Sequence, residues 1–188
     1  MDVKGKALYK IREEKEMNQV METILTRRSV RAFNEKDIPR EELEQILKAA
    51  IYAPSGMNRQ TFQFTAIVNR DKIQELAGLI EKSLSRTGYN FYKPAVLVLT
   101  SNTKESNWAK EDNACALENM FLAAKSFGIG SVWINQLQGI CDEPEIRTFL
   151  KAVGVPDNHV VYGAAALGYA EKEPAGAVNK TGIIKIVD

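Results

Sequence analysis

The chain has 188 residues, and its 25 lysines and arginines against 24 aspartates and glutamates leave a net charge of +1. This charge argues against a nucleic-acid-binding protein, and no apolar run approaches the roughly 20 residues of a membrane helix. With 45% hydrophobic and 26% charged residues, the composition is that of a globular domain and not of a disordered chain. The N-terminus lacks an apolar signal core and the two cysteines make no disulfide framework, so we expect a cytoplasmic protein.

One histidine and two separated cysteines cannot build a Cys/His zinc site, so we predict no metal. The common glycine-rich nucleotide motifs and the serine-hydrolase motif are also absent.

In chain order, the charge-dense residues 1–18 predict an N-terminal arm that is partly helical and weakly packed. A short helix is expected over residues 19–26, and three of its residues should face inward: Val20, Ile24 and Leu25. The clearest helix follows Pro39, which suits a first-turn position, and ends before Pro54. Its apolar residues recur with helical spacing, and they are Leu43, Ile46, Leu47, Ala50 and Ile51.

The remaining elements alternate between strands and helices. Strands are predicted over residues 62–68, 93–100, 131–135 and 159–170, and helices over 71–83, 110–127 and 143–153. The first of these strands should carry Phe62, Phe64, Ala66 and Val68 on one face. Gly128 and Gly154 fall where helix-ending glycines belong, and residues 180–188 look like an extended tail. This order predicts one α+β domain over residues 19–188, with the last predicted strand central.

Three arginines and a serine follow the first helix, namely Arg27, Arg28, Ser29 and Arg31. Guanidinium groups and a short hydroxyl can hold a phosphate dianion through several charge-assisted hydrogen bonds. The alternative is that these basic residues favour the helix C-terminus through its dipole.

The loop between the clearest helix and the first strand concentrates proline, serine, glycine and carboxamides. Its candidate site residues are Pro54, Ser55, Gly56, Asn58 and Gln60. Carboxamides offer both donors and acceptors, which suits the polar edge of a heterocycle. The alternative is a loop that only needs turn-forming residues.

Glycines flank the start of the strand that carries Trp133, and Ile134, Asn135 and Gln136 follow it. Glycine permits close backbone approach, and the tryptophan offers a large flat surface. A core tryptophan beside turn glycines is the alternative.

Together these motifs resemble the FMN-dependent nitroreductase family over about residues 18–188. The most specific parts are R-R-S-x-R, then A-P-S-G-x-N-x-Q, and the stretch E-N-M-x-L-A-A-x-x-x-G-I-G-S-x-W-I at residues 118–134. The resemblance implies a central, mostly antiparallel sheet flanked by helices, in a domain-intertwined homodimer with an FMN in each half of the interface.

The resemblance also implies a role for each candidate residue. Arg27 and Ser29 would hold the FMN phosphate together with Lys180 of the tail, Arg28 would line the ribityl and pyrimidine atoms, and Arg31 would stabilise the reduced flavin near N1 and C2=O. Residues 54–58 of the partner subunit would lie against the ring, with Gln60 at the foot of that loop. Residues 133–136 would face the reactive centre of the flavin, where backbone N–H groups can touch N5.

The implied function is ping-pong hydride transfer from NAD(P)H through flavin N5 to a small electron-poor acceptor, a nitroaromatic or a quinone. No side chain is expected to act as acid or base, because the cofactor carries the chemistry. The alternatives are a dehalogenating or flavin-fragmenting enzyme on the same scaffold, or a non-catalytic flavin-binding module.

Some residues depart from the family pattern or stand outside it. The family often has Pro-Trp where this chain has Thr61 and Phe62, and a second tail cation where it has Gly182. Asn90 and Lys93 are further candidates for flavin contacts. Of the three remaining reactive residues, His159 is expected at the surface or a strand edge, Cys115 in the core and Cys141 exposed.

Overall fold

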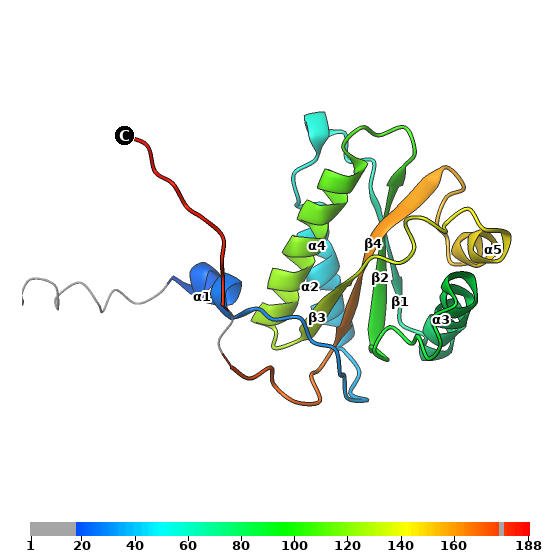
Figure 1. Cartoon of the computed structure of the whole chain (residues 1–188), viewed down its shortest axis with the longest axis horizontal. Coiled ribbons are helices and arrows are strands. Elements are labelled where there is room, and N and C mark those ends of the chain that lie inside the picture. The colour runs from blue at the N-terminus through cyan, green and yellow to red at the C-terminus, as the bar shows by residue number, and fades with distance from the viewer. Residues whose placement is uncertain (1–17, 177–178) are drawn as a thin grey trace, which may run out of the picture.

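The computed structural model describes residues 18–176 and 179–188 as a sheet between two helical layers (Figure 1). The sheet has the strand order β1-β2-β4-β3, and all three neighbouring pairs are antiparallel. The strands are β1 (Gln63–Ile67), β2 (Val96–Thr103), β3 (Gly130–Ile134) and β4 (His159–Gly168). The predicted α+β class and the predicted antiparallel sheet are therefore confirmed, with β2 and β4 in the centre.

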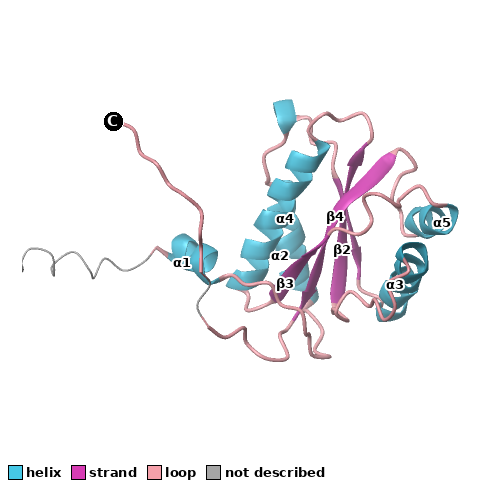
Figure 2. Cartoon of the chain, viewed as in Figure 1, coloured by secondary structure: helices cyan, strands magenta, loops and turns pink. Residues whose placement is uncertain are grey.

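Helices cover both faces of the sheet (Figure 2). On one face lie α2 (Arg40–Ile51) and α4 (Ala109–Ser126), and on the other α3 (Arg70–Leu84) and α5 (Pro144–Ala152). The short helix α1 (Gln19–Thr26) packs mainly on α4, within the part of the chain that the structure describes. In β2, Leu97 and Leu99 enter the core beneath α3 and α5, whereas Val96 and Val98 enter the core beneath α2 and α4. A strand buried on both faces shows no polar alternation, as the sequence predicted.

The two glycines predicted to end helices do so. Gly128 follows α4 with φ +71°, and the N–H of Ile129 donates to the carbonyl of Ala124 at 2.8 Å. Gly154 follows α5 with φ +90°, and the N–H of Val155 donates to the carbonyl of Leu150 at 2.9 Å. A positive φ suits glycine because it lacks a Cβ.

The predicted burial of α1 is wrong for the single chain, although its bounds are confirmed. Val20 is 63% exposed, Ile24 43% and Leu25 61%, and no residue of α1 is buried. Ile51, from the apolar spacing of the clearest helix, and Val68, from the apolar face of the first predicted strand, are also exposed. Periodicity identifies an apolar face but does not say which surface covers it.

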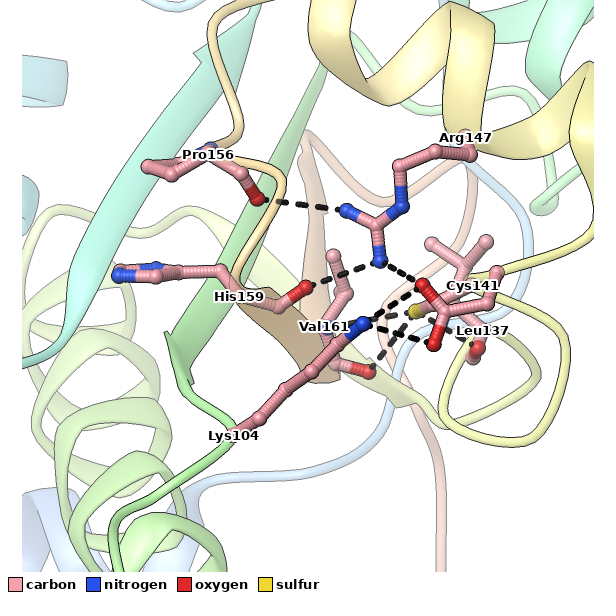
Figure 3. Close-up of polar contacts among 8 residues, drawn as sticks. Lys104, Leu137, Cys141, Arg147, Pro156, His159 and Val161 are labelled. Atoms are coloured by element: carbon pink, nitrogen blue, oxygen red, sulfur yellow. Dashed lines mark hydrogen bonds and ion pairs between the residues drawn. The ribbon is translucent and has the colours of Figure 1, made fainter.

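Both cysteine predictions are wrong. Cys115 is exposed because it lies on the outer face of α4. Cys141 is 2% exposed, its thiol donates to the Leu137 carbonyl at 2.9 Å, and it accepts the N–H of Val161 at 3.3 Å (Figure 3). Burial raises the pKa of this thiol, which keeps it neutral.

His159 begins β4 but is only 7% exposed, so its predicted surface position is wrong. Its Nδ1 lies 3.1 Å from the buried hydroxyl of Ser101. Arg147 of α5 draws the strand start inward by donating to the carbonyls of His159 at 2.9 Å and Pro156 at 3.3 Å, and it pairs with Asp142 at 2.7 Å (Figure 3).

The prediction of an N-terminal arm falls, apart from Asn18, outside the described residues. Within these residues no helix has the length and apolar character needed to cross a membrane. Nor do three or more His, Cys, Asp or Glu side chains gather there as they would around a metal ion.

The free energy of unfolding should fall as the pH drops below 6.5, the ordinary pKa of histidine. Burial lowers the pKa of His159, so below this pH the unfolded chain binds a proton that the folded chain does not. His159→Gln removes the only histidine of the chain. In urea unfolding at a series of pH values, this variant should show a smaller fall between about pH 7 and pH 5.5. If the free energy of unfolding falls equally steeply in both proteins, the lowered pKa of His159 is not the cause.

Candidate functional site

The segment that carries the arginines runs along the edge of the sheet. The N–H of Val30 donates to the carbonyl of Ser131 at 2.9 Å, and Ser29 forms an isolated parallel bridge with Ser131 in β3. Val30 is buried against Gly130, where an added Cβ would lie 2.8 Å from a Val30 methyl group. The absence of a side chain at Gly130 therefore lets the arginine segment approach β3 closely.

A hollow of about 130 Å³ lies between this segment and the C-terminal end of α4. Its lining residues include three cations, Arg27, Arg28 and Lys125, against one carboxylate, Glu173. Gly130 and Ser131 form part of its wall. An excess of positive charge around a small polar hollow suits a phosphate group. Lys125 and Ser131 were not predicted, although Lys125 stands one turn before the helix-ending Gly128.

Of the residues predicted to hold the phosphate or to lie near it, only Arg27 and Arg28 line this hollow. Arg27 lies 3.6 Å from the carboxylate of Glu118 and packs over the ring of Phe121, and Arg28 donates to the carbonyl of Gly176. Ser29 and Arg31 are exposed and do not line the hollow. Lys180 is exposed on the tail and is likewise not among the lining residues.

The predicted ring-side loop contains the short helix η2 (Gly56–Asn58) and is held by its own side chains. The hydroxyl of Ser55 accepts the N–H of Gln60 at 3.1 Å, and the carboxamide of Asn58 accepts the Nε2 of Gln60 at 2.7 Å. Met57, Asn58 and Gln60 all have positive φ values, between 50° and 54°. Non-glycine residues rarely adopt this conformation, so the surrounding contacts must hold the loop in place. Pro54, at its start, is exposed.

Asp112 and Trp108 fix this loop to the first turn of α4. The N–H of Gly56 donates to Asp112 Oδ1 at 2.8 Å, and Asp112 is only 4% exposed. Gly56 also lies so close to the Trp108 ring that an added Cβ would be 2.6 Å from a ring carbon. Neither residue was predicted from the sequence. Asp112 could have been found, because it lies four residues before Ala116 on the apolar face of α4.

In one chain the loop and the phosphate hollow lie toward opposite ends of α4. Asp112 holds the loop at the first turn, whereas Lys125 lines the hollow near the last turn. Thirteen residues of helix separate these two positions, or about 20 Å along its axis. The structure therefore does not bring the two predicted parts of the site together within one chain.

Trp133 and Asn135, at the end of β3, line a hollow together with residues from the first turns of α4, among them Ala114. Trp133 is 45% exposed and its ring lies 6.3 Å from that of Phe121, so it is not a core residue. Ile134 is buried at 3% exposure. The N–H of Asn135 donates to Gln136 Oε1 at 3.1 Å and is therefore occupied within the chain.

The two further candidates, Asn90 and Lys93, lie in the loop between α3 and β2. The carboxamide of Asn90 accepts the N–H of Tyr92 at 2.9 Å. Lys93 lines a different hollow, together with Phe33 and Arg70. The structure thus separates both residues from the arginine hollow.

Comparisons with known proteins identify the family and the fold of the chain. Residues 24–96 and 86–169 match the model of the Nitroreductase family. A solved nitroreductase with bound FMN from Bacteroides fragilis NCTC 9343 is 45% identical and superposes with a TM-score of 0.86, over 91% of this chain and 100% of that one. The FMN reductase (NAD(P)H) of Bacillus subtilis (strain 168) is 30% identical over 87% of this chain and 73% of its own length.

A nitroreductase with bound FMN from Desulfitobacterium hafniense DCB-2 is 24% identical and has a TM-score of 0.81, over 92% of this chain and 100% of that one, which shows the fold alone. The family match covers most of this chain. The chain therefore belongs to the nitroreductase family.

Gly56→Ala should destabilise the fold, because the new methyl group would clash with the Trp108 ring. Overpacking of this kind costs about 1–3 kcal/mol. Urea unfolding followed by circular dichroism measures the change. Gly139→Ala is the matched control, because a Cβ there meets nothing within 4 Å. Equal midpoints for the two variants would contradict the close contact with Trp108.

Proposed function

We propose that this chain is an FMN-dependent NAD(P)H oxidoreductase that passes hydride to a small electron-poor acceptor, a nitroaromatic or a quinone, in ping-pong order. The observation that carries the proposal is the hollow with three cations and one carboxylate, in a chain that belongs to the nitroreductase family. FMN supplies the atom that accepts and returns hydride, and the protein supplies binding, orientation and charge.

Arg27 and Arg28 would hold the FMN phosphate, together with Lys125 and Ser131 of the same hollow. Guanidinium and ammonium groups donate short, charge-assisted hydrogen bonds to phosphate oxygens. Ser29 would add its exposed hydroxyl, and Arg31 would lie beside the pyrimidine edge. Lys180 would join the phosphate once the tail is placed against a second subunit.

The ring side of the site would come from two subunits. Residues 133–136 would lie beneath the flavin in one subunit, and the partner subunit would supply Pro54, Ser55, Gly56, Asn58 and Gln60. The separation of loop and hollow along α4 supports this arrangement, because one chain cannot close the site. No general acid or base is assigned, since hydride transfer needs none from the protein.

Two uncovered apolar surfaces support a homodimer. One is the exposed face of α1, with Val20, Met21, Ile24 and Leu25. The other is the tail, where Ile183, Ile184, Ile186 and Val187 are 81% to 95% exposed. Apolar side chains gathered on a helix and a tail are typical of surfaces that bind another chain. An obligate interface of this kind buries about 2,000–5,000 Å².

Anaerobic addition of NADH or NADPH to the yellow, FMN-loaded protein should bleach the flavin absorbance. Addition of a nitroaromatic compound or a quinone should then restore it, because the acceptor takes up the hydride. The visible spectrum measures both steps. If the protein binds FMN but stays yellow with both donors, it is a flavin-binding module and not the proposed enzyme. Bleaching without recovery would instead contradict the proposed acceptors.

A further inference from the structure

The side chain of Gln136, directly after β3, is held by two hydrogen bonds to the same oxygen. The N–H of Asn135 donates to Gln136 Oε1 at 3.1 Å. The hydroxyl of Tyr89, from the loop between α3 and β2, lies 3.1 Å from the same atom. Tyr89 is 47 positions away in the chain, so this contact joins two distant segments.

These contacts decide which way the carboxamide of Gln136 points. A backbone N–H can only donate, so the atom that faces Asn135 must be the oxygen and not the nitrogen. The Tyr89 hydroxyl, which faces this same acceptor, must therefore donate its proton. Burial raises the pKa of Tyr89, so the hydroxyl stays protonated as a donor throughout the working pH range. With Oε1 occupied twice, the end left to interact elsewhere is the Nε2 amide, which can only donate.

The loop that carries Tyr89 is held rigidly. The Tyr89 ring packs edge-on against the ring of Phe91 at 4.9 Å, and Phe91 is 1% exposed. Phe91, Tyr92 and Lys93 all have positive φ values, between 52° and 66°. Three consecutive non-glycine residues in this conformation are costly, and such strain gathers at functional sites where the surroundings impose it.

The chain beyond Gln136 is equally fixed. Leu137 is 2% exposed, and its carbonyl accepts the buried thiol of Cys141 at 2.9 Å. On the other side, Ile134 is buried in the sheet. The backbone at Gln136 is therefore anchored before and after, and the Tyr89 hydrogen bond restrains the remaining freedom of the side chain.

We infer that Tyr89 is a positioning residue, which orients Gln136 so that its Nε2 amide donates a hydrogen bond to the FMN. The inference rests on the proposed function, in which residues 133–136 face the flavin. A fixed donor near the reactive edge stabilises the negative charge that reduction adds, and so raises the reduction potential. Without the Tyr89 hydroxyl, only the N–H of Asn135 holds Oε1, so the carboxamide is oriented less firmly and Nε2 donates to the FMN for less of the time.

Tyr89→Phe, measured in the FMN-loaded protein by spectroelectrochemical titration, tests the inference. The ring is kept, so packing against Phe91 should persist and FMN stoichiometry should match that of the parent. The preference for reduced over oxidised FMN should fall about 3- to 10-fold, which lowers the two-electron midpoint by about 15–30 mV. Tyr92→Phe is the matched control, since this residue of the same loop is 39% exposed and its midpoint should equal that of the parent.

Gln136→Leu shows whether Tyr89 acts on the midpoint by orienting the Gln136 carboxamide or by another effect of its loop. In this background the Tyr89→Phe change should no longer move the midpoint, because the carboxamide that it orients is gone. An unshifted midpoint in Tyr89→Phe overturns the inference, as does an equal shift with Leu at position 136. These results leave the proposed function intact if FMN remains bound and is reduced by NAD(P)H. A parent protein that takes up no FMN overturns both.

Discussion

The hydrogen bond from the Gly56 N–H to the buried carboxylate of Asp112 is the constraint on which the proposed site depends. It fixes the carboxamide loop at the first turn of α4, and the Trp108 ring leaves no room for the loop to move inward. A carboxylate in an apolar core is stable only when its hydrogen bonds are satisfied, so this contact is costly to break. The loop therefore cannot reach the arginine hollow of its own chain.

Because one chain cannot complete the site, the exposed apolar side chains of α1 and the tail are explained as surfaces that bind a second subunit. An α1 with no buried residue contributes little to the stability of a single chain, and an isolated helix of eight residues is marginal in water. In the proposed homodimer, a second chain would cover the exposed side chains of α1 and would supply a second loop to the hollow. Formation of the dimer would then both stabilise α1 and complete the FMN site. The arginine segment fits this scheme, because its tight packing on Gly130 holds it at the sheet edge without help from α1.

Local patterns in the sequence were enough to predict much of the fold. The helix-ending glycines and the unbroken apolar run of β2 are read over a few residues, and both were confirmed. The apolar period of α2 was confirmed at Leu43, Ile46 and Ala50 but not at Ile51, which is exposed. The family was also predictable, because R-R-S-x-R and A-P-S-G-x-N-x-Q are short and specific. The wrong predictions concern the burial of single side chains. Cys115 and Cys141 exchanged their expected environments because burial depends on neighbours from other elements.

The candidate site could likewise be predicted only where its residues form a local pattern in the sequence. The arginine segment was found from its composition, but Lys125 and Asp112 act through contacts that join distant parts of the chain. The hydrogen bond between Tyr89 and Gln136 spans 47 positions and leaves no local pattern. Such pairs become visible only when the sheet has placed the segments side by side.

The central claim is that one chain cannot complete the FMN site. Val20→Glu with Ile24→Glu puts charge on the exposed face of α1, where neither change should disturb the fold of the single chain. Size-exclusion chromatography with light scattering and flavin absorbance measures mass and FMN together. We expect the unmodified protein to elute as a dimer with FMN, and the double variant to elute as a monomer without it. A folded monomer that retains FMN would contradict the account.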